Sequence, residues 1–235
     1  ERRVLEQQND NLRKDELLAQ SELRILQNQI NPHFLFNTLN MIYKKAYSEG
    51  AYETSELMEK TSQLLRYGLD NASKISSLKK EIKAIYNYNY IQEKRYGDRI
   101  RFLMDIEEDL PDIPMPSMVL QPLVENAIYH GMEFMDGDGE ILLKVWKEEG
   151  DLYFSVIDNG LGMTEEQVGN LFTGASHVDS KRGSGIGVKN VNERIKLYFG
   201  EKYGLSIESE PDEGTTVKIH LPVVTYSEAV ERGMV

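Results

Sequence analysis

The chain has 235 residues, of which 40% are hydrophobic and 28% are charged. This composition is typical of a globular protein rather than a disordered or collagen-like chain, and the length suits two domains of roughly 150 residues or less. The net charge of −12 disfavours general nucleic-acid binding, and the absence of cysteine excludes disulfides, cysteine-based zinc sites and cysteine nucleophiles.

Apolar runs indicate whether a chain can span a membrane or begins with a signal peptide. No run approaches about 18 consecutive apolar residues, and no basic segment precedes an apolar one, so the sequence predicts neither a membrane span nor a signal peptide. The first residue is Glu1 rather than Met. We therefore expect a piece of a longer protein, with room for a membrane segment in the part outside this chain.

Residues 1–30 are predicted to form one long helix, because they lack Gly and Pro and are rich in good helix formers. Apolar residues follow a heptad pattern at Leu5, Leu12, Ala19, Leu23, Leu26 and Ile30. Asn9 and Glu16 place polar residues in the same stripe. The stripe favours a coiled coil with a second copy of the chain. A helix packed on its own domain is the alternative.

A helical hairpin is expected next. Pro32 interrupts the helical pattern because it lacks a backbone donor. The pattern resumes from Phe34 and stops near Gly50, and a second helical run covers residues 52–71. Two such runs form an antiparallel hairpin, and a pair of hairpins would form a dimeric four-helix bundle.

The rest of the chain mixes helices and strands. Helical patterns cover residues 78–96, 117–131, 164–172 and 186–199, and strand patterns cover residues 100–107, 140–149, 151–158, 204–210 and 215–221. Ser76 or Ser77 is expected to cap the first of these helices, and Thr164 the third. The prolines between residues 111 and 116 predict a loop. The order predicts an α+β sandwich with helices on one face of a sheet.

Two glycine clusters lie in this second part. The first, DNGLG (158–162), follows a strand, and its carboxylate can accept a hydrogen bond from an amine such as that of adenine. The second, GSGIG (183–187), precedes a helix, where backbone N–H groups beside Lys181 and Arg182 can bind an anion. A turn is the alternative for each cluster taken alone. The P-loop motif is absent.

A third segment, ENAIYHG (125–131), lies on a predicted helix. Asn126 and His130 are four residues apart and therefore share one helical face. An amide oxygen on a helix suits Mg²⁺, which keeps several waters and bridges phosphates. A surface or capping role is the alternative for a lone Asn.

The three segments in this order resemble the boxes of the Bergerat-fold ATPases, a superfamily that includes gyrase and the histidine kinases. The resemblance covers residues 98–221. It implies that Asn126 holds Mg²⁺ beside ATP and that Asp158 accepts the adenine amine. It also implies an adenine pocket and a mobile lid over the phosphates. The residues concerned are Gly160, Gly162 and Thr215 for the pocket and Gly183, Gly185 and Gly187 for the lid.

Residues 29–40, QINPHFLFNTLN, resemble the phosphoacceptor motif of the sensor histidine kinases of the LytS/YesM type. Residues 95–100 and 117–131 are similar to the same group. The resemblance implies that His33 is the phosphoacceptor, since a neutral imidazole is nucleophilic near neutral pH. Phe34 stands where most histidine kinases have an acidic residue, so Asn37 and Gln29 become the candidates for orienting the ring.

Three further residues are candidates for roles at the phosphates. Glu125 is expected to act as a base or to position a water. His130 is expected to reach the phosphate groups, with a structural role as the alternative, and Lys181 belongs to the expected anion site beside the second glycine cluster.

The implied function is that of the cytoplasmic part of a two-component sensor histidine kinase whose full-length protein is anchored in the cell membrane. A helical dimerisation and phosphotransfer region (1–96) would precede an ATP-binding domain (98–221) and a C-terminal tail (222–235). ATP with Mg²⁺ would phosphorylate His33 in a homodimer, and the phosphoryl group would pass to a response regulator aspartate. The alternatives are a Bergerat-type ATPase clamp without phosphohistidine and a non-catalytic dimeric scaffold or phosphatase for a response regulator.

Overall fold

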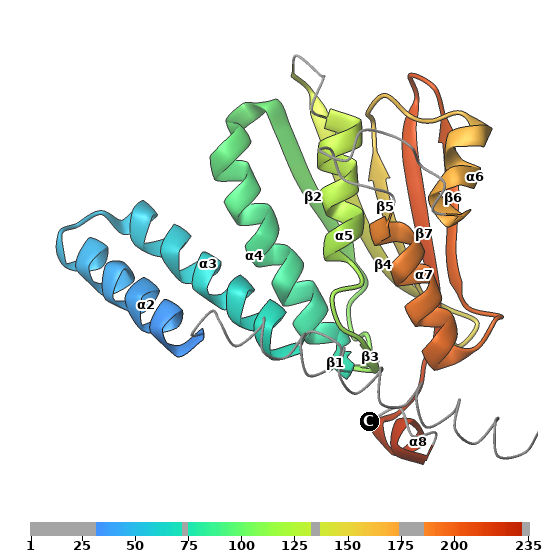
Figure 1. The fold of residues 1–235 in the computed structure, drawn as a ribbon, viewed down its shortest axis with the longest axis horizontal. Helices are drawn as coiled ribbons and strands as arrows, with labels where there is room; N and C mark the ends of the chain where they lie inside the picture. The colour runs from blue at the N-terminus through green and yellow to red at the C-terminus, as the bar shows by residue number, and fades with distance from the viewer. Residues whose placement is uncertain (1–31, 72–74, 133–136, 174–185, 232–235) are drawn as a thin grey trace, which may run out of the picture. The chain divides into compact units, whose positions relative to one another are not determined.

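A computed structural model of the chain describes residues 32–71, 75–132, 137–173 and 186–231 (Figure 1). The predicted coiled coil over residues 1–30, including Asn9 and Glu16, lies outside these residues. Residues 1–62 and residues 63–235 form two compact units. This division lies before the predicted boundary near residue 97, and Leu64 already packs against the core of the second unit.

The hairpin predicted from the sequence is present. Its helices are α2 (Pro32–Ser48) and α3 (Tyr52–Asn71), the second of which continues into the second unit. Pro32 is the first residue of α2, where a missing N–H has no intrahelical partner to lose. Gly50 has a φ of 77° and closes the turn. The Ser55 hydroxyl donates to the Tyr43 carbonyl at 3.1 Å and ties the two helices together.

The second unit begins with a short strand, β1 (Ile75–Ser77), followed by α4 (Leu78–Tyr96). The helix confirms the prediction for residues 78–96, and Ser77 is its N-cap residue. The Ser77 side chain makes no capping bond, and the carboxylate of Asp112 accepts from the Lys79 N–H at 2.9 Å instead. A distant loop therefore supplies the capping bond.

The proline-rich segment, predicted as a loop, contains the strand β3 (Pro114–Pro116). It pairs antiparallel with β1, and Ser76 lies opposite Met115. Prolines are tolerated here because a two-stranded ribbon has only edges, where a strand needs fewer donors.

The main sheet has five strands in the order β2-β4-β5-β7-β6. They are β2 (Ile100–Ile106), β4 (Gly139–Glu148), β5 (Asp151–Asp158), β6 (Gly204–Glu210) and β7 (Gly214–Pro222). The pair β2 and β4 is parallel, and the other neighbours are antiparallel. Alternate residues along the strands are buried and build the core with the helices, among them Leu143, Phe154 and Ile219. The α+β class predicted from the sequence is confirmed.

Helices cover one face of this sheet (Figure 1). They include α5 (Gln121–Asn126), α6 (Glu165–Thr173) and α7 (Ile186–Phe199), and Ala127–Met132 continue α5 as a π-helix. The helix predicted from Ser117 starts four residues late, because Met118 has a φ of 54° that no α-helix accommodates. The predicted cap at Thr164 is confirmed: its hydroxyl accepts from the Gln167 N–H at 3.3 Å.

The segment after Pro222, expected to be a tail, contains a helix, α8 (Tyr226–Glu231). Its Ala229 is fully buried. Thr225 and Glu228 form a reciprocal capping box, with the Thr225 N–H donating to Glu228 at 2.7 Å. The sequence contained this Thr-x-x-Glu pattern, and the prediction overlooked it.

Candidate functional site

His33 is an exposed residue in the first turn of α2. The amide nitrogen of Asn37, one helical turn later, lies 3.2 Å from its Nδ1 and 3.3 Å from its Nε2. In the orientation shown, the Asn37 amide nitrogen donates to a ring nitrogen of His33 that carries no proton. When the Asn37 amide is turned by 180°, its oxygen accepts from the ring N–H of His33 instead. In that orientation the other ring nitrogen keeps its lone pair free for attack. The expected pairing of Asn37 with the ring therefore has a geometric basis. Gln29, the other candidate for orienting the ring, lies outside the described residues.

Asp158 ends β5 and is 7% exposed. Its Oδ1 accepts from the Gly160 N–H at 3.0 Å. Burial raises the pKa of the Asp158 carboxyl to about 6, while the backbone N–H groups of Gly160 and Thr215 act in the opposite direction. A buried carboxylate that is still ionised at pH 7 is a suitable acceptor for an exocyclic amine.

Thr215 lies directly opposite Asp158 in the β5–β7 register, so both side chains point to the same face of the sheet. Its hydroxyl is 2.9 Å from the hydroxyl of Ser209. Ser209 also accepts from the Met163 N–H and donates to the Gly214 carbonyl, each at 2.8 Å. The structure thus brings Asp158 and Thr215 together and adds Ser209, which links the loop after β5 to the β6–β7 turn.

Two positions near Asp158 require glycine because the backbone there packs closely against other backbone atoms. Gly162 has a φ of 64°, and a Cβ placed there would lie 1.8 Å from the Glu210 carbonyl oxygen. Gly214 has a φ of 102°, and its Cβ would lie 2.1 Å from the Asp158 carbonyl oxygen. The contact observed at Gly162 is therefore with the backbone of the β6–β7 turn, and its expected place in an adenine pocket stays a prediction.

Asn126 is half-buried and is the last residue of α5 before the helix widens into its π-helical turn. Such π-helical turns recur at functional sites. A Cβ placed on Gly187, in the first turn of α7, would lie 4.0 Å from the Asn126 amide nitrogen. Asn126 and the helix that follows the second glycine cluster are therefore neighbours.

Asn126 offers one amide oxygen, which suits a Mg²⁺ ion whose other ligands are phosphate oxygens and water. No group of three or more His, Cys, Asp or Glu residues that could hold a metal ion occurs among the described residues. Among the described residues, none forms a hydrogen bond with the Asn126 side chain, so none of them occupies its amide oxygen. A single open amide fits a hard cation that keeps most of its own ligands.

The other residues predicted at the phosphates are only partly described. Glu125 accepts from the Gln121 side chain at 2.9 Å on its own helix. The backbone of His130 lies in the π-helical turn, but its side chain is outside the described part of the structure. Lys181, Gly183 and Gly185 also lie outside it, whereas Gly187 is in α7.

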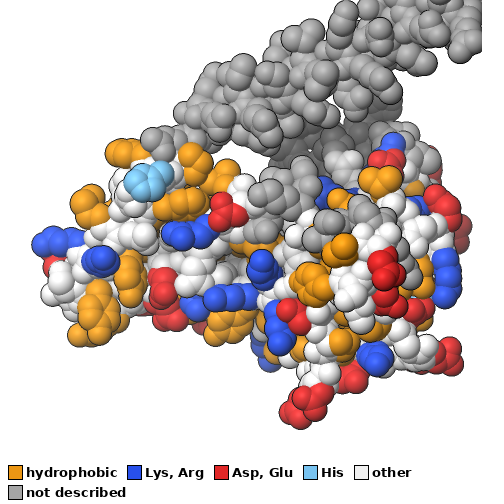
Figure 2. Space-filling model, turned by 90° about the horizontal axis from the view of Figure 1, so that it is seen from below, with side chains coloured by type: hydrophobic (Ala, Val, Ile, Leu, Met, Phe, Trp, Pro, Cys, Tyr) orange, Lys and Arg blue, Asp and Glu red, His pale blue; other side chains and the backbone are white. Residues whose placement is uncertain are grey.

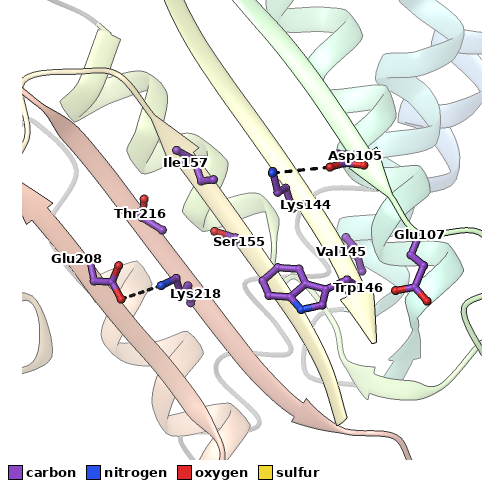
Figure 3. Close-up of a pocket in the computed structure, with 10 residues that line it drawn as sticks. All are labelled: Asp105, Glu107, Lys144, Val145, Trp146, Ser155, Ile157, Glu208, Thr216 and Lys218. Carbon is purple, nitrogen blue, oxygen red and sulfur yellow. Dashed lines mark hydrogen bonds and ion pairs between the residues drawn. The ribbon is translucent and has the colours of Figure 1, made fainter. Parts of the chain in front are cut away.

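A depression of about 750 Å³ lies on the opposite face of the same sheet (Figure 3). It is lined by residues from all five strands of the sheet, and ion pairs join Lys144 to Asp105 and Lys218 to Glu208. None of the predicted nucleotide-binding residues that the structure describes lines it. Asp158 and Thr215 lie on the other, helix-covered face of the sheet and are distinct from this depression.

Two family models match the chain. The model described as "Histidine kinase" matches residues 21–100, and the model described as "Histidine kinase-, DNA gyrase B-, and HSP90-like ATPase" matches residues 112–225. Sensor histidine kinase YesM of Bacillus subtilis is 35% identical over 221 residues, which cover 94% of this chain and 37% of YesM. The uncharacterised protein YwpD of the same organism is 38% identical over 211 residues, covering 88% of this chain and 72% of YwpD.

The chain belongs to the sensor histidine kinases of the LytS/YesM type. Sensor protein LytS of Bacillus anthracis is a further relative of this histidine kinase chain, 34% identical over 89% of the chain and 35% of LytS. The chain thus spans little more than a third of YesM or LytS. Among the described residues of this family member, no helix has the length and apolar character that crossing a membrane requires.

Solved histidine kinase structures share the fold of this chain. The catalytic domain of histidine kinase ThkA in one nucleotide-free form aligns with a TM-score of 0.52 at 18% identity, covering 64% of this chain and 96% of that domain. A second nucleotide-free form gives a TM-score of 0.50 at 20% identity and covers 64% of this chain and 98% of that domain. At this identity the likeness concerns the fold alone.

Proposed function

We propose that this chain transfers the γ-phosphoryl group of ATP to His33 and that the group then passes to an aspartate of a response regulator. The observation that carries the proposal is the exposed His33–Asn37 pair, which lies on the same chain as a buried, ionisable acceptor at Asp158. Membership of the sensor histidine kinases supports it. The need for ATP favours action on the cytoplasmic side of a membrane.

His33 is the nucleophile in this reaction. A ring nitrogen attacks the γ-phosphorus, an N–P bond forms, and the bond between the γ-phosphorus and the bridging oxygen breaks, so ADP leaves. The proton of the other ring nitrogen passes to solvent, since His33 is exposed. Asn37 holds the ring in the tautomer that leaves the attacking nitrogen unprotonated.

Asp158 and Asn126 act on ATP. The Asp158 carboxylate accepts a hydrogen bond from the adenine amine, and Thr215 lies beside it. Asn126 is the residue that would hold Mg²⁺, which stabilises the charge on the transferred group when it is bound. Lys181 and the glycines at 183, 185 and 187 belong to the proposed lid over the phosphates.

A homodimer is part of the proposal. The hairpin exposes large apolar side chains, with Phe34 68%, Met41 64% and Tyr47 60% exposed. Figure 2 shows such hydrophobic side chains on the surface of this hairpin. Exposed apolar side chains of this size favour burial against a second hairpin.

Incubation with γ-labelled ATP and Mg²⁺ tests the proposal. We expect acid-labile, base-stable label on the protein, and no label on His33→Gln. The variant should still bind ATP as the unmodified chain does, because His33 and Asp158 lie in separate units.

Three other outcomes would contradict the proposal. Label that persists in His33→Gln rejects His33 as the acceptor. Release of inorganic phosphate without label indicates an ATPase clamp. ATP binding with neither label nor phosphate release indicates a scaffold.

A further inference from the structure

Glu81 of α4 is a buried carboxyl group that has no place in the nucleotide site described above. It is 1% exposed. Its two oxygens accept from three consecutive backbone N–H groups, those of Met118 at 2.6 Å, Val119 at 3.0 Å and Leu120 at 3.1 Å. The Tyr67 hydroxyl donates to Oε1. Four donors therefore converge on one side chain.

Only a carboxylate satisfies this arrangement. An ionised carboxylate has acceptors alone, whereas a glutamine would turn N–H donors toward other donors. Burial raises the pKa of the Glu81 carboxyl, while the Tyr67 hydroxyl and the three N–H groups act in the opposite direction. The buried Glu81 carboxylate is therefore stable in its charged form only while these hydrogen-bond donors remain in place.

The backbone that Glu81 binds has an unusual conformation. Met118 has a φ of 54°, in the left-handed region that a side chain disfavours. Successive N–H groups in such a turn form a concave site for an anion. Glu81 supplies that anion from within the chain and thereby holds residues 118–120 in this shape.

The same loop is bound from its other side by α7. Arg194 donates from Nη1 to the Ser117 carbonyl at 2.7 Å. The helix that follows the loop, α5, buries Leu123 and Val124 and ends at Asn126. A shift of the loop would therefore carry Asn126 with it relative to Gly187 and the start of α7.

Tyr67 extends the linkage to α3. Its hydroxyl also lies 3.1 Å from the hydroxyl of Ser76, in β1. Burial raises the pKa of Tyr67 well above its usual value, with the nearby Glu81 carboxylate as the next cause, so its hydroxyl remains protonated and can donate. One side chain of the α3 helix thus fixes the carboxylate that fixes the loop before α5.

We propose that Glu81 is a positioning residue for Mg²⁺-dependent ATP binding, acting through the loop at residues 117–120 on Asn126, and that Tyr67 holds Glu81 in place. This inference rests on the proposed function, in which Asn126 serves the metal. Glu81 touches neither nucleotide nor metal. It sets where α5 begins, and α5 sets where Asn126 lies.

Calorimetric titration of the whole chain with a non-hydrolysable ATP analogue, with Mg²⁺ and with EDTA, tests the role. For Glu81→Gln we expect an affinity about tenfold or more weaker with Mg²⁺, the scale expected for losing hydrogen bonds to a charge. Affinity in EDTA should stay within about twofold, because the adenine acceptor Asp158 is untouched. Tyr67→Phe should also weaken binding with Mg²⁺, but by less than Glu81→Gln does. Glu81→Asp should bind the analogue with Mg²⁺ more tightly than Glu81→Gln, because it keeps a carboxylate.

Glu93→Gln is the matched control, since Glu93 is an exposed residue of the same helix. Equal losses with Mg²⁺ and EDTA, or no loss in a folded Glu81→Gln protein, would overturn the positioning role. If thermal unfolding shows that Glu81→Gln does not fold, Tyr67→Phe and Glu81→Asp decide by the same criterion. Absence of label on His33 in the unmodified chain contradicts the proposed function, whereas label with unchanged Glu81 variants contradicts the positioning role alone.

Discussion

His33 lies exposed in the first turn of α2, and its partner Asn37 is four residues away on the same helix. Asp158 is buried, and its surroundings come from β7 and from the loop that Ser209 ties to the β6–β7 turn. The first site therefore depends on local helical geometry, and the second depends on tertiary packing. Changes near His33 should alter the rate of phosphorylation, whereas changes near Asp158 should alter stability and nucleotide affinity.

Gly162→Ala should give the largest effect, because the second site depends on backbone packing. Its new Cβ would meet the Glu210 carbonyl oxygen at 1.8 Å, and the backbone must move. We expect the free energy of unfolding to fall by about 3 kcal/mol. Urea unfolding measures the change.

Gly150→Ala is the control for Gly162→Ala. It also has a positive φ, 92°, but a Cβ there meets nothing within 4 Å. Its loss should be only about 1 kcal/mol, from backbone conformation alone. Equal losses for the two variants would mean that the packing against Glu210 contributes nothing.

Asp158→Asn should separate affinity from stability. The amide oxygen can still accept from the Gly160 N–H, but the amide nitrogen would face the adenine amine, so nucleotide affinity should fall about 10- to 100-fold. The nucleotide-free protein should unfold at the same or a higher temperature, since burial already disfavours the charged carboxylate. A large drop in the unfolding temperature with unchanged affinity would assign Asp158 a purely structural role.

Asn37→Ala tests the exposed site, at His33. Losing the contact with the ring should slow labelling of His33 about tenfold, while nucleotide affinity stays the same. Thr38 is the neighbouring control, because its hydroxyl donates to the Phe34 carbonyl of its own helix at 2.9 Å. If Thr38→Ala slows labelling as much as Asn37→Ala does, the ring contact is not the cause.

The same contrast explains what the sequence could predict. The helices α2, α3 and α4 and the β4–β5 hairpin follow from local periodicity and turn residues, so their bounds agree with the predictions to within a few residues. The His33–Asn37 contact follows from a spacing of four on a helix. These features need no knowledge of distant parts of the chain.

Features built by long-range contacts were missed. Strand β3 exists only because β1, some 40 residues earlier, pairs with it. Ser209 and Glu81 lie on ordinary strand and helix patterns, and their importance depends on loops 46 and 37 residues away. No local pattern distinguishes a buried carboxylate from an exposed one on a helix as polar as α4.

The smallest expected effect is the dependence of binding on pH, and it tests the buried state of Asp158 directly. Because its pKa is raised to about 6, the folded protein binds a proton more strongly than the unfolded chain does between about pH 4 and 6. The contribution of Asp158 to the stability of the nucleotide-free protein should therefore decrease as the pH rises from about 4 to 6. Nucleotide affinity should change in the opposite direction, since the adenine amine needs the ionised acceptor.

With a pKa of about 6, the ionised fraction of Asp158 falls about tenfold between pH 7 and 5, which sets the upper limit for the loss of affinity. The nucleotide's own phosphates titrate in the same range, so Asp158→Asn is the reference at each pH. The ratio of the affinity of the unmodified chain to that of the variant should fall as the pH falls. A ratio independent of pH would mean that the carboxylate is not the acceptor of the amine, and the contrast between an exposed nucleophile and a buried nucleotide acceptor would lose its second half.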